Sequence, residues 1–163
     1  MRLLGLMFAW LVSALVAYVL AGIASQQVVL AGVRQYRDVP VGVNVATTLD
    51  ALVAMPIGAL YLGVIAVGFL VAFYVANLVK AALPALSGIA YPTAGAVAIV
   101  IALVWMRARY DIVPILGAQE AYGFWLQVAA GAVGGILFEV LRPKTEEEAL
   151  ARRGLRPRRK VAA

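Results

Sequence analysis

Four long stretches without a charged residue dominate this sequence. In order they are 31, 29, 26 and 18 residues long, and they run from Leu3 to Val33, from Ala51 to Val79, from Ala81 to Met106 and from Ala121 to Phe138. A helix needs about 20 apolar residues to cross a bilayer, and a charge at its centre costs several kcal/mol. The pattern therefore predicts an all-α, polytopic membrane protein built as a four-transmembrane-helix bundle.

Residues near the ends of these stretches set the expected bounds of the helices. Pro56 should kink the second helix, which Thr47 or Thr48 can cap, and Trp105 and Trp125 are typical anchors at the water boundary. The spans are therefore expected at about 8–33, 57–79, 88–106 and 124–141. Together they form one transmembrane domain of residues 1–143, and residues 144–163 form a basic tail.

The first span could be mistaken for a signal peptide. Arg2 precedes the apolar run, and Gly22-Ile23-Ala24 has the small-x-small spacing of a cleavage site. The apolar part of a signal peptide is about 7–15 residues long, whereas this run has 31. We therefore expect a retained membrane anchor.

The distribution of Lys and Arg predicts the orientation of the chain. With four spans both termini lie on one side, which holds Arg2, Lys80 and eight basic residues from Arg142 to Lys160, ten of the 14 in the sequence. The remaining four lie in the loops of the other side. Because basic loops stay in the cytoplasm, we expect cytoplasmic termini, in the inner membrane of a bacterial cell.

The sequence contains neither His nor Cys, which limits the chemistry open to it. Haem, zinc, copper and di-iron sites depend largely on these two residue types, and so does nucleophilic catalysis by Ser-His or Cys-His pairs. We therefore expect no metal site, no cofactor and no enzymatic activity.

Small residues recur at every fourth position in each expected span. Such rows let helix backbones approach closely in lipid, where no hydrophobic force drives helices together. The rows are Gly5, Ala9, Ser13, Ala17 and Ala21; Gly68, Ala72 and Ala76; Ala90, Ala94, Ala98 and Ala102; and Gly131 and Gly135. They predict a tight bundle, with Gly68, Gly131 and Gly135 as packing positions, but they could equally serve a homo-oligomer or a partner subunit.

The two halves of the sequence resemble each other at an offset of 73 residues. AYVLAG at 17–22 pairs with AYPTAG at 90–95, and seven of the 22 positions from Ala17 to Asp38 are identical to their counterparts. Chance would give about two in so biased a composition. We therefore predict a duplicated helical hairpin, in which the two pairs of spans are parallel repeats.

The same offset pairs Arg34 with Arg107 and Asp38 with Asp111, each just beyond the end of a helix. One interpretation is an anchor at the water boundary with a local ion pair, which contributes little to stability. The other is a symmetric charged mouth over the axis of the bundle.

Uncharged and acidic side chains near the spans form a second group of candidates. Under the duplication Gln26 and Gln27 would lie at membrane depth, level with Ala98, where an amide needs a hydrogen-bonding partner. They would either join helices or line a path for a solute, and Asn77 and Glu139 have the same two interpretations. We expect Glu139 to pair with Arg142 or with an arginine of the tail.

The tail is strongly basic. From Arg142 to Lys160 its net charge is +8 − 3 = +5, and the residues that could contact a partner are Arg152, Arg153, Arg156, Arg158, Arg159 and Lys160. A solvated tail that enforces topology, a contact with anionic lipid headgroups and a contact with an acidic partner all fit this composition. No aromatic residues alternate with the charges, so we do not expect nucleic-acid binding.

Two functional classes follow. The first is a non-catalytic accessory subunit or assembly factor of a larger membrane complex, which accounts for the small-residue faces and the basic tail. The second is a small channel or transporter for an ion or small solute, which accounts for the repeat and the paired loop charges. Transport would demand an oligomer, because four helices rarely enclose a polar path.

Overall fold

The computed structural model describes residues 2–34, 40–53, 56–110 and 115–144, and the regular secondary structure of this part of the chain is helical. The helices are α1 (Arg2–Arg34), α2 (Val41–Val53), α3 (Pro56–Ala82), α4 (Ala90–Tyr110) and α5 (Ala121–Leu141), with two 3-10 turns, η1 (Pro84–Leu86) and η2 (Leu116–Ala118). No strand occurs among these residues, so the predicted all-α class is confirmed.

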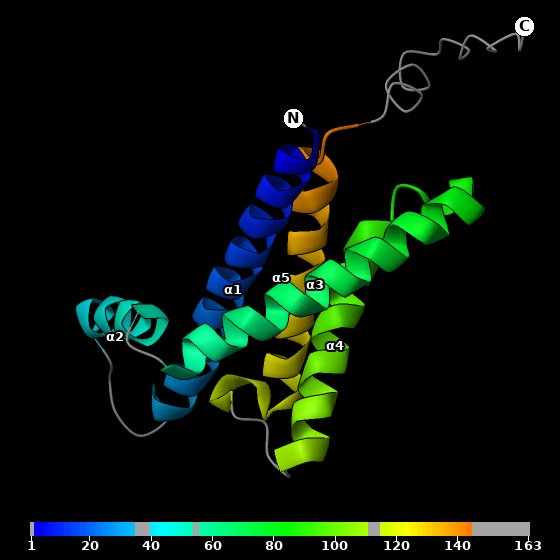
Figure 1. Ribbon diagram of the computed structural model, residues 1–163. Helices are drawn as coiled ribbons and strands as arrows, with labels where there is room; N and C mark the ends of the chain where they lie inside the picture. The colour runs from blue at the N-terminus through cyan, green and yellow to red at the C-terminus, as the bar shows by residue number, and fades with distance from the viewer. Residues whose placement is uncertain (1, 35–39, 54–55, 111–114, 145–163) are drawn as a thin grey trace, which may run out of the picture.

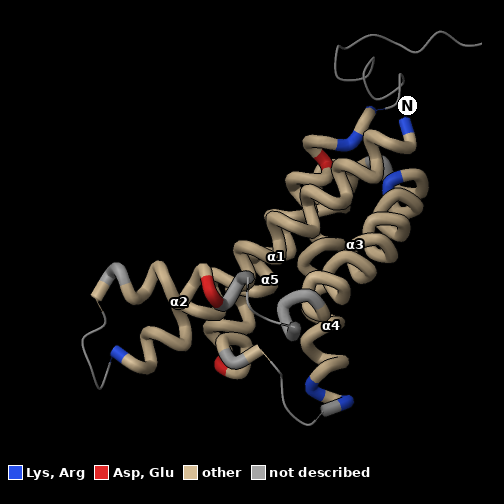
Figure 2. Tube along the Cα trace, turned by 60° about the vertical axis from the view of Figure 1, so that its left-hand side comes forward, with Lys and Arg blue, Asp and Glu red and all other residues tan. Residues whose placement is uncertain are grey.

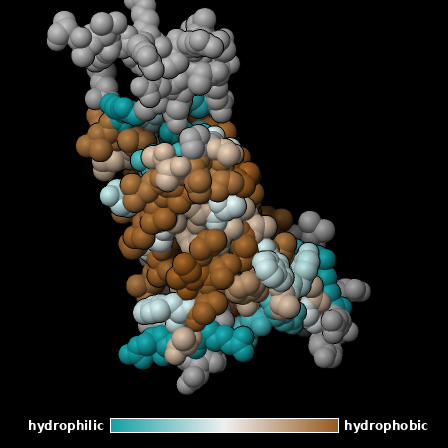
Figure 3. Space-filling view, turned by 90° about the vertical axis from the view of Figure 1, so that its right-hand side faces the viewer, coloured by the Kyte–Doolittle hydropathy of each residue, from teal (hydrophilic) through white to brown (hydrophobic). Residues whose placement is uncertain are grey.

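Four of the helices, α1, α3, α4 and α5, are long and apolar enough to cross a membrane. A belt of apolar side chains covers the middle of the molecule, and hydrophilic residues lie toward its two ends (Figure 3). Charged residues likewise gather at the ends and leave the middle of each long helix free of charge (Figure 2). These features indicate an integral membrane protein.

The four long helices run alternately in opposite directions. The N-terminus, the end of α5 and the link between α3 and α4 lie toward one end of the molecule, whereas α1 and α4 end at the other (Figure 1). Arg2, Lys80 and Arg142 belong to the first of these, which we call the basic end. The other is the opposite end.

α2 is a separate helix that lies beside the last part of α1, at the opposite end (Figure 1). It begins at Val41, so the expected cap at Thr47 or Thr48 is corrected: the hydroxyls of Thr47 and Thr48 bond to the carbonyl oxygens of Val43 and Asn44 inside the helix, at 2.9 and 2.8 Å. Pro56 does not kink one long helix as predicted, and it is instead the first residue of α3. Proline suits this position because the amide hydrogen of a first helical residue has no hydrogen-bond acceptor within the helix, so its absence costs nothing.

The long helices share one core. α5 packs between α1 and α4, and α3 crosses obliquely over the bundle (Figure 1). Ile65, Phe69, Ile99 and Leu103 are buried at its centre. Toward the basic end the core continues as an aromatic cluster, in which the rings of Phe73 and Phe138 stack with centroids 4.3 Å apart.

Contacts of α1 with the end and the start of α5 fix its level in the bundle. Gly5 lies against Pro143, and the amide of Gly117 donates to the hydroxyl of Ser25 at 3.2 Å. α1 has 33 residues and is therefore about 50 Å long, more than the roughly 30 Å of hydrocarbon. Its last turns thus extend beyond the start of α5, toward α2.

Candidate functional site

The small-residue row of α1 lies inside the bundle. Ala9, Ser13, Ala17 and Ala21 are all buried, and the methyl group of Ala17 lies close to Gly134 of α5. The backbones of α1 and α5 approach closely here, because neither side carries more than a small side chain. This row is therefore used within the chain.

The predicted packing glycines of α5 face α4. A β-carbon at Gly131 would overlap Ile99 and the carbonyl oxygen of Gly95, and one at Gly135 would overlap the carbonyl oxygen of Tyr91. Gly95 is equally intolerant of a side chain, because a β-carbon added there would overlap the carbonyl oxygen of Gly131. Gly95 was not among the predicted packing positions, although it lies within the AYPTAG segment.

The rows of α3 and α4 have a different environment. They line an elongated depression on the surface, which we call the α3–α4 groove and define by Gly68, Ala72 and Ala76 of α3 and Ala90, Ala94, Ala98 and Ala102 of α4. Two adjoining hollows of about 670 and 560 Å³ make it up, and they share Val67, Gly68, Ala98 and Ile101. At Gly68 a β-carbon would lie at an ordinary 3.7 Å from that of Ala98, so this position is less restricted than Gly131.

The α3–α4 groove spans the molecule from the turn at Leu86 to Trp105. On α3 the lining runs from Leu60 to Val79, 20 residues that correspond to about 30 Å of helix, close to the thickness of the hydrocarbon layer. Among the described residues that line it, Thr93 and Trp105 carry polar side-chain groups, and the hydroxyl of Thr93 bonds to the carbonyl oxygens of Ile89 and Ala90 at 2.8 and 3.0 Å. Such a surface offers shape and dispersion contacts, and no group for acid–base chemistry.

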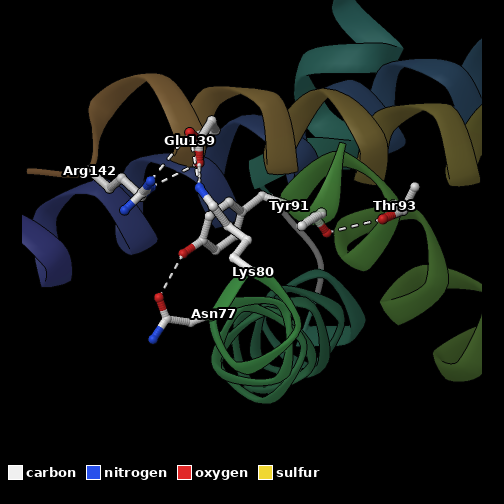
Figure 4. A network of polar contacts seen from close by, with 7 residues as sticks. Asn77, Lys80, Tyr91, Thr93, Glu139 and Arg142 are labelled. Atoms are coloured by element: carbon white, nitrogen blue, oxygen red, sulfur yellow. Dashed lines mark hydrogen bonds and ion pairs between the residues drawn. The ribbon is translucent and has the colours of Figure 1, made fainter. Parts of the chain in front are cut away.

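A cluster of charged and polar residues lies at the basic end (Figure 4). The carboxylate of Glu139 accepts hydrogen bonds from Lys80 at 3.2 and 3.3 Å and from Arg142 at 2.8 and 3.3 Å. Both cations also lie over the ring of Tyr91, at 4.8 and 5.1 Å from its centroid. The predicted pairing of Glu139 with Arg142 is present, and Lys80 joins it.

Asn77 belongs to the rim of this cluster. Its side-chain oxygen accepts a hydrogen bond from the hydroxyl of Tyr91, at 3.4 Å, while the residue itself remains exposed. Tyr91 thus connects the two sequence candidates Asn77 and Glu139, which come from α3 and α5.

A second polar contact lies in the interior and was missed from the sequence. The side chain of Gln127 is completely buried, accepts a hydrogen bond from the hydroxyl of Tyr61 at 2.8 Å, and donates one to the carbonyl of Ala21 at 2.9 Å. It joins α1, α3 and α5. An amide in the middle of a charge-free run is the signal that could have revealed it.

With this geometry in place, comparison with known proteins adds nothing further. No protein-family model matches the chain, and neither a curated protein nor a solved structure matches it. The function is therefore inferred from the residues and their arrangement alone.

The candidate glutamines do not lie where the duplication would place them. They follow Ser25, which contacts the loop between α4 and α5, so they lie near the opposite end and not level with Ala98. Gln27 is exposed and pairs with Asn44 of α2, with N–O distances of 3.0 and 3.4 Å, while Gln26 is half-buried. Their expected position at mid-depth is corrected, because α1 is longer than the bilayer and its packing on α5 decides which part lies at the centre.

The remaining candidates are charged. Arg34 and Arg107 are exposed in the last turns of α1 and α4, at the opposite end. Asp38 and Asp111 lie outside the described residues, and so do the candidate tail residues Arg152, Arg153, Arg156, Arg158, Arg159 and Lys160. Whether the two Arg–Asp pairs face each other thus stays a prediction.

Proposed function

We propose that this protein is a non-catalytic accessory subunit or assembly factor that holds a transmembrane helix of another membrane protein in the α3–α4 groove. One observation carries the proposal. The small-residue rows of α1 and α5 are used in internal packing, whereas those of α3 and α4 also line a groove on the surface, with Ala76, Ala90 and Ala98 buried at its floor.

The dimensions and chemistry of the groove favour a helix as the occupant. It is about as long as the hydrocarbon layer is thick, and its floor consists of Gly and Ala. Close backbone approach over small residues stabilises helix pairs in lipid. A mobile lipid chain gains little free energy from contact with this groove alone, because the surrounding lipid chains offer it a similarly apolar surface.

Shape favours a different protein over a second copy. In a twofold dimer each subunit presents the same patch to the other, so two concave grooves would face each other and leave a gap. A single helix from another subunit fills a groove of this form without that mismatch.

Co-purification of the full chain from its native membrane, combined with a groove-blocking variant, tests the proposal. Val97 lines the groove and is 52% exposed, so Val97→Trp should fill it without disturbing the core. Val133 on α5 is 42% exposed and lines no groove described above, which makes Val133→Trp the matched control. We expect Val97→Trp to release a partner that Val133→Trp retains.

A site-specific cross-link identifies what occupies the groove. The chain has no Cys, so Thr93→Cys introduces a single thiol in the groove wall. Mass spectrometry of the cross-linked product should locate the attachment within an apolar segment of another protein. Attachment to a second copy of this chain, or equal retention by both Trp variants, would contradict the proposal.

The channel or transporter remains the alternative and has less support. Ile65, Phe69 and Ile99 fill the centre of the described bundle, so a polar path would have to lie between copies. A homo-oligomer in the cross-linking experiment would favour this alternative.

The location and history of the chain are part of the same proposal. The basic charge of one end supports cytoplasmic termini in a bacterial inner membrane. The duplication is supported by the sequence echo at an offset of 73 residues. Two differences between the halves count against a duplication. The first half has the helix α2 where the second half has only the short turn η2. In addition, α1 ends at Arg34, whereas α4 continues for three residues beyond Arg107, the counterpart of Arg34.

A further inference from the structure

A second groove lies between the first turns of α1 and the last turns of α3, and we call it the α1–α3 groove. Its walls carry Leu6, Met7 and Trp10 from α1 and Leu70, Phe73 and Tyr74 from α3. It exists because α3 crosses the bundle obliquely and diverges from α1 toward the basic end (Figure 1). The indole nitrogen of Trp10 donates to the carbonyl of Ala66 at 3.0 Å and ties the two helices together where the groove closes.

The size and depth of this groove suit part of one membrane leaflet. Its volume is about 500 Å³, within the roughly 300–1,000 Å³ typical of small-molecule sites. From Arg2 to Trp10 the helix rises about 12 Å, somewhat less than half of the roughly 30 Å hydrocarbon layer. Gly5 packs against Pro143, which follows α5, so the groove opens at the water boundary of the basic end.

Charge is concentrated at one end of the groove only. Arg2, Asn77 and Arg142 line its mouth, and the remaining lining is apolar or aromatic. Lys80 lies next to this mouth, bonded to Glu139 beside Arg142. Among the described residues here, Arg2, Lys80 and Arg142 carry three positive charges against the single negative charge of Glu139.

We propose that the α1–α3 groove binds an anionic phospholipid of the leaflet at the basic end, with an acyl chain along Met7, Trp10 and Leu70 and the phosphate at Arg2. Arg142 is buried and bonded to Glu139, and it adds positive charge beside that position. Arginine recognises phosphate through paired N–H donors, and the excess of positive charge favours a headgroup with net negative charge over a zwitterionic one. The walls accommodate the acyl chain, and the charged mouth supplies the preference for the headgroup. This inference is independent of the helix-docking proposal.

Fluorescence quenching of Trp10 tests the site directly. The chain has three Trp residues, and Trp105 and Trp125 are exposed side chains outside this groove. The full-length Trp105→Phe/Trp125→Phe variant therefore reports from the groove alone. It is placed in mixed vesicles of phosphatidylcholine with a minor share of phosphatidylglycerol, and bromine atoms are carried on the chains of one lipid or the other.

We expect brominated phosphatidylglycerol to quench Trp10 more strongly, per molecule, than brominated phosphatidylcholine. One basic residue near an anionic lipid corresponds to about a fivefold preference, so Arg2→Gln should reduce the selectivity by about that factor. Lys144→Gln removes a charge of the same sign from the segment after α5 but not from the groove lining, and it should leave the selectivity unchanged.

Two results would overturn the inference. Equal quenching by the two brominated lipids would show that the groove has no preference for an anionic headgroup. An equal reduction by Arg2→Gln and Lys144→Gln would show general attraction of the basic end for an anionic surface in place of a defined site. Both experiments use the isolated protein, so neither result depends on a partner helix in the α3–α4 groove.

Discussion

The hydroxyl of Tyr61 donates a hydrogen bond of 2.8 Å to the side-chain oxygen of Gln127, whose nitrogen donates in turn to the backbone carbonyl of Ala21. Both side chains are buried, and together they join α1, α3 and α5 through polar contacts inside the bundle. In lipid such a bond has no competing water, so each partner depends on the other.

A double-mutant cycle measures this dependence. We expect Gln127→Leu to lower the free energy of unfolding in mild detergent by about 1–2 kcal/mol, because it leaves the Tyr61 hydroxyl without its acceptor. Adding Tyr61→Phe should cost less in that variant than in the native protein, since the hydroxyl is already unpaired. Strictly additive effects would show that the two side chains do not interact.

Gly131→Leu should destabilise the bundle more than Val133→Leu. A side chain at Gly131 would overlap Ile99 and the backbone of Gly95, whereas Val133 faces outward. We expect Gly131→Leu to lower the free energy of unfolding by about 3 kcal/mol, at the upper end of overpacking effects. The control, Val133→Leu, should lower it by about 0.5 kcal/mol or less. Thermal unfolding in one detergent compares them, and equal tolerance would mean that the helix pair α4–α5 can separate without cost.

Glu139→Gln should destabilise the basic end. The substitution keeps the size of the side chain but leaves the charges of Lys80 and Arg142 without their shared carboxylate. We expect the free energy of unfolding to fall by about 2 kcal/mol at neutral pH. This is less than the roughly 3–5 kcal/mol lost when a fully buried pair is broken, because Glu139 is partly accessible to solvent. The double variant Glu139→Gln/Lys80→Met also removes one cation, and it should recover part of the lost free energy of unfolding.

Glu120→Gln is the control for that measurement. Glu120 is exposed at the opposite end and precedes α5, so its neutralisation should change stability by about 0.5 kcal/mol or less. If both substitutions had the same effect, the cluster around Glu139 would contribute no more than an ordinary surface charge.

Cysteine labelling determines the orientation of the chain. Because the sequence has no Cys, each introduced thiol gives an unambiguous signal. In intact bacterial cells we expect a charged, impermeant thiol reagent to label Glu120→Cys and to label Lys144→Cys only after the cells are opened. The reverse pattern would place the basic end outside and contradict the charge rule that predicted it.

The elements that cross the membrane could be predicted from the sequence because spanning is a property of a single segment. A helix of sufficient length satisfies its own backbone hydrogen bonds, and hydropathy decides whether lipid accepts it. The runs without charge therefore correspond to α1, α3, α4 and α5, although Pro56 begins α3 and does not kink a longer helix as predicted. The pairing of Glu139 with Arg142 was equally local, since three residues separate them on one helix.

Only the tertiary structure decided how these helices use their faces. Four rows of small residues look equivalent in the sequence, yet those of α1 and α5 are used in internal contacts, while those of α3 and α4 form the floor of a groove on the surface. The burial of Gln127 against Tyr61 and the level of Gln26 along α1 were likewise fixed by packing. The physical reason is that helix association in lipid depends on the fit between surfaces that are distant in sequence. Hydropathy measures the transfer of a single segment from water into lipid, and it therefore contains no information about that fit.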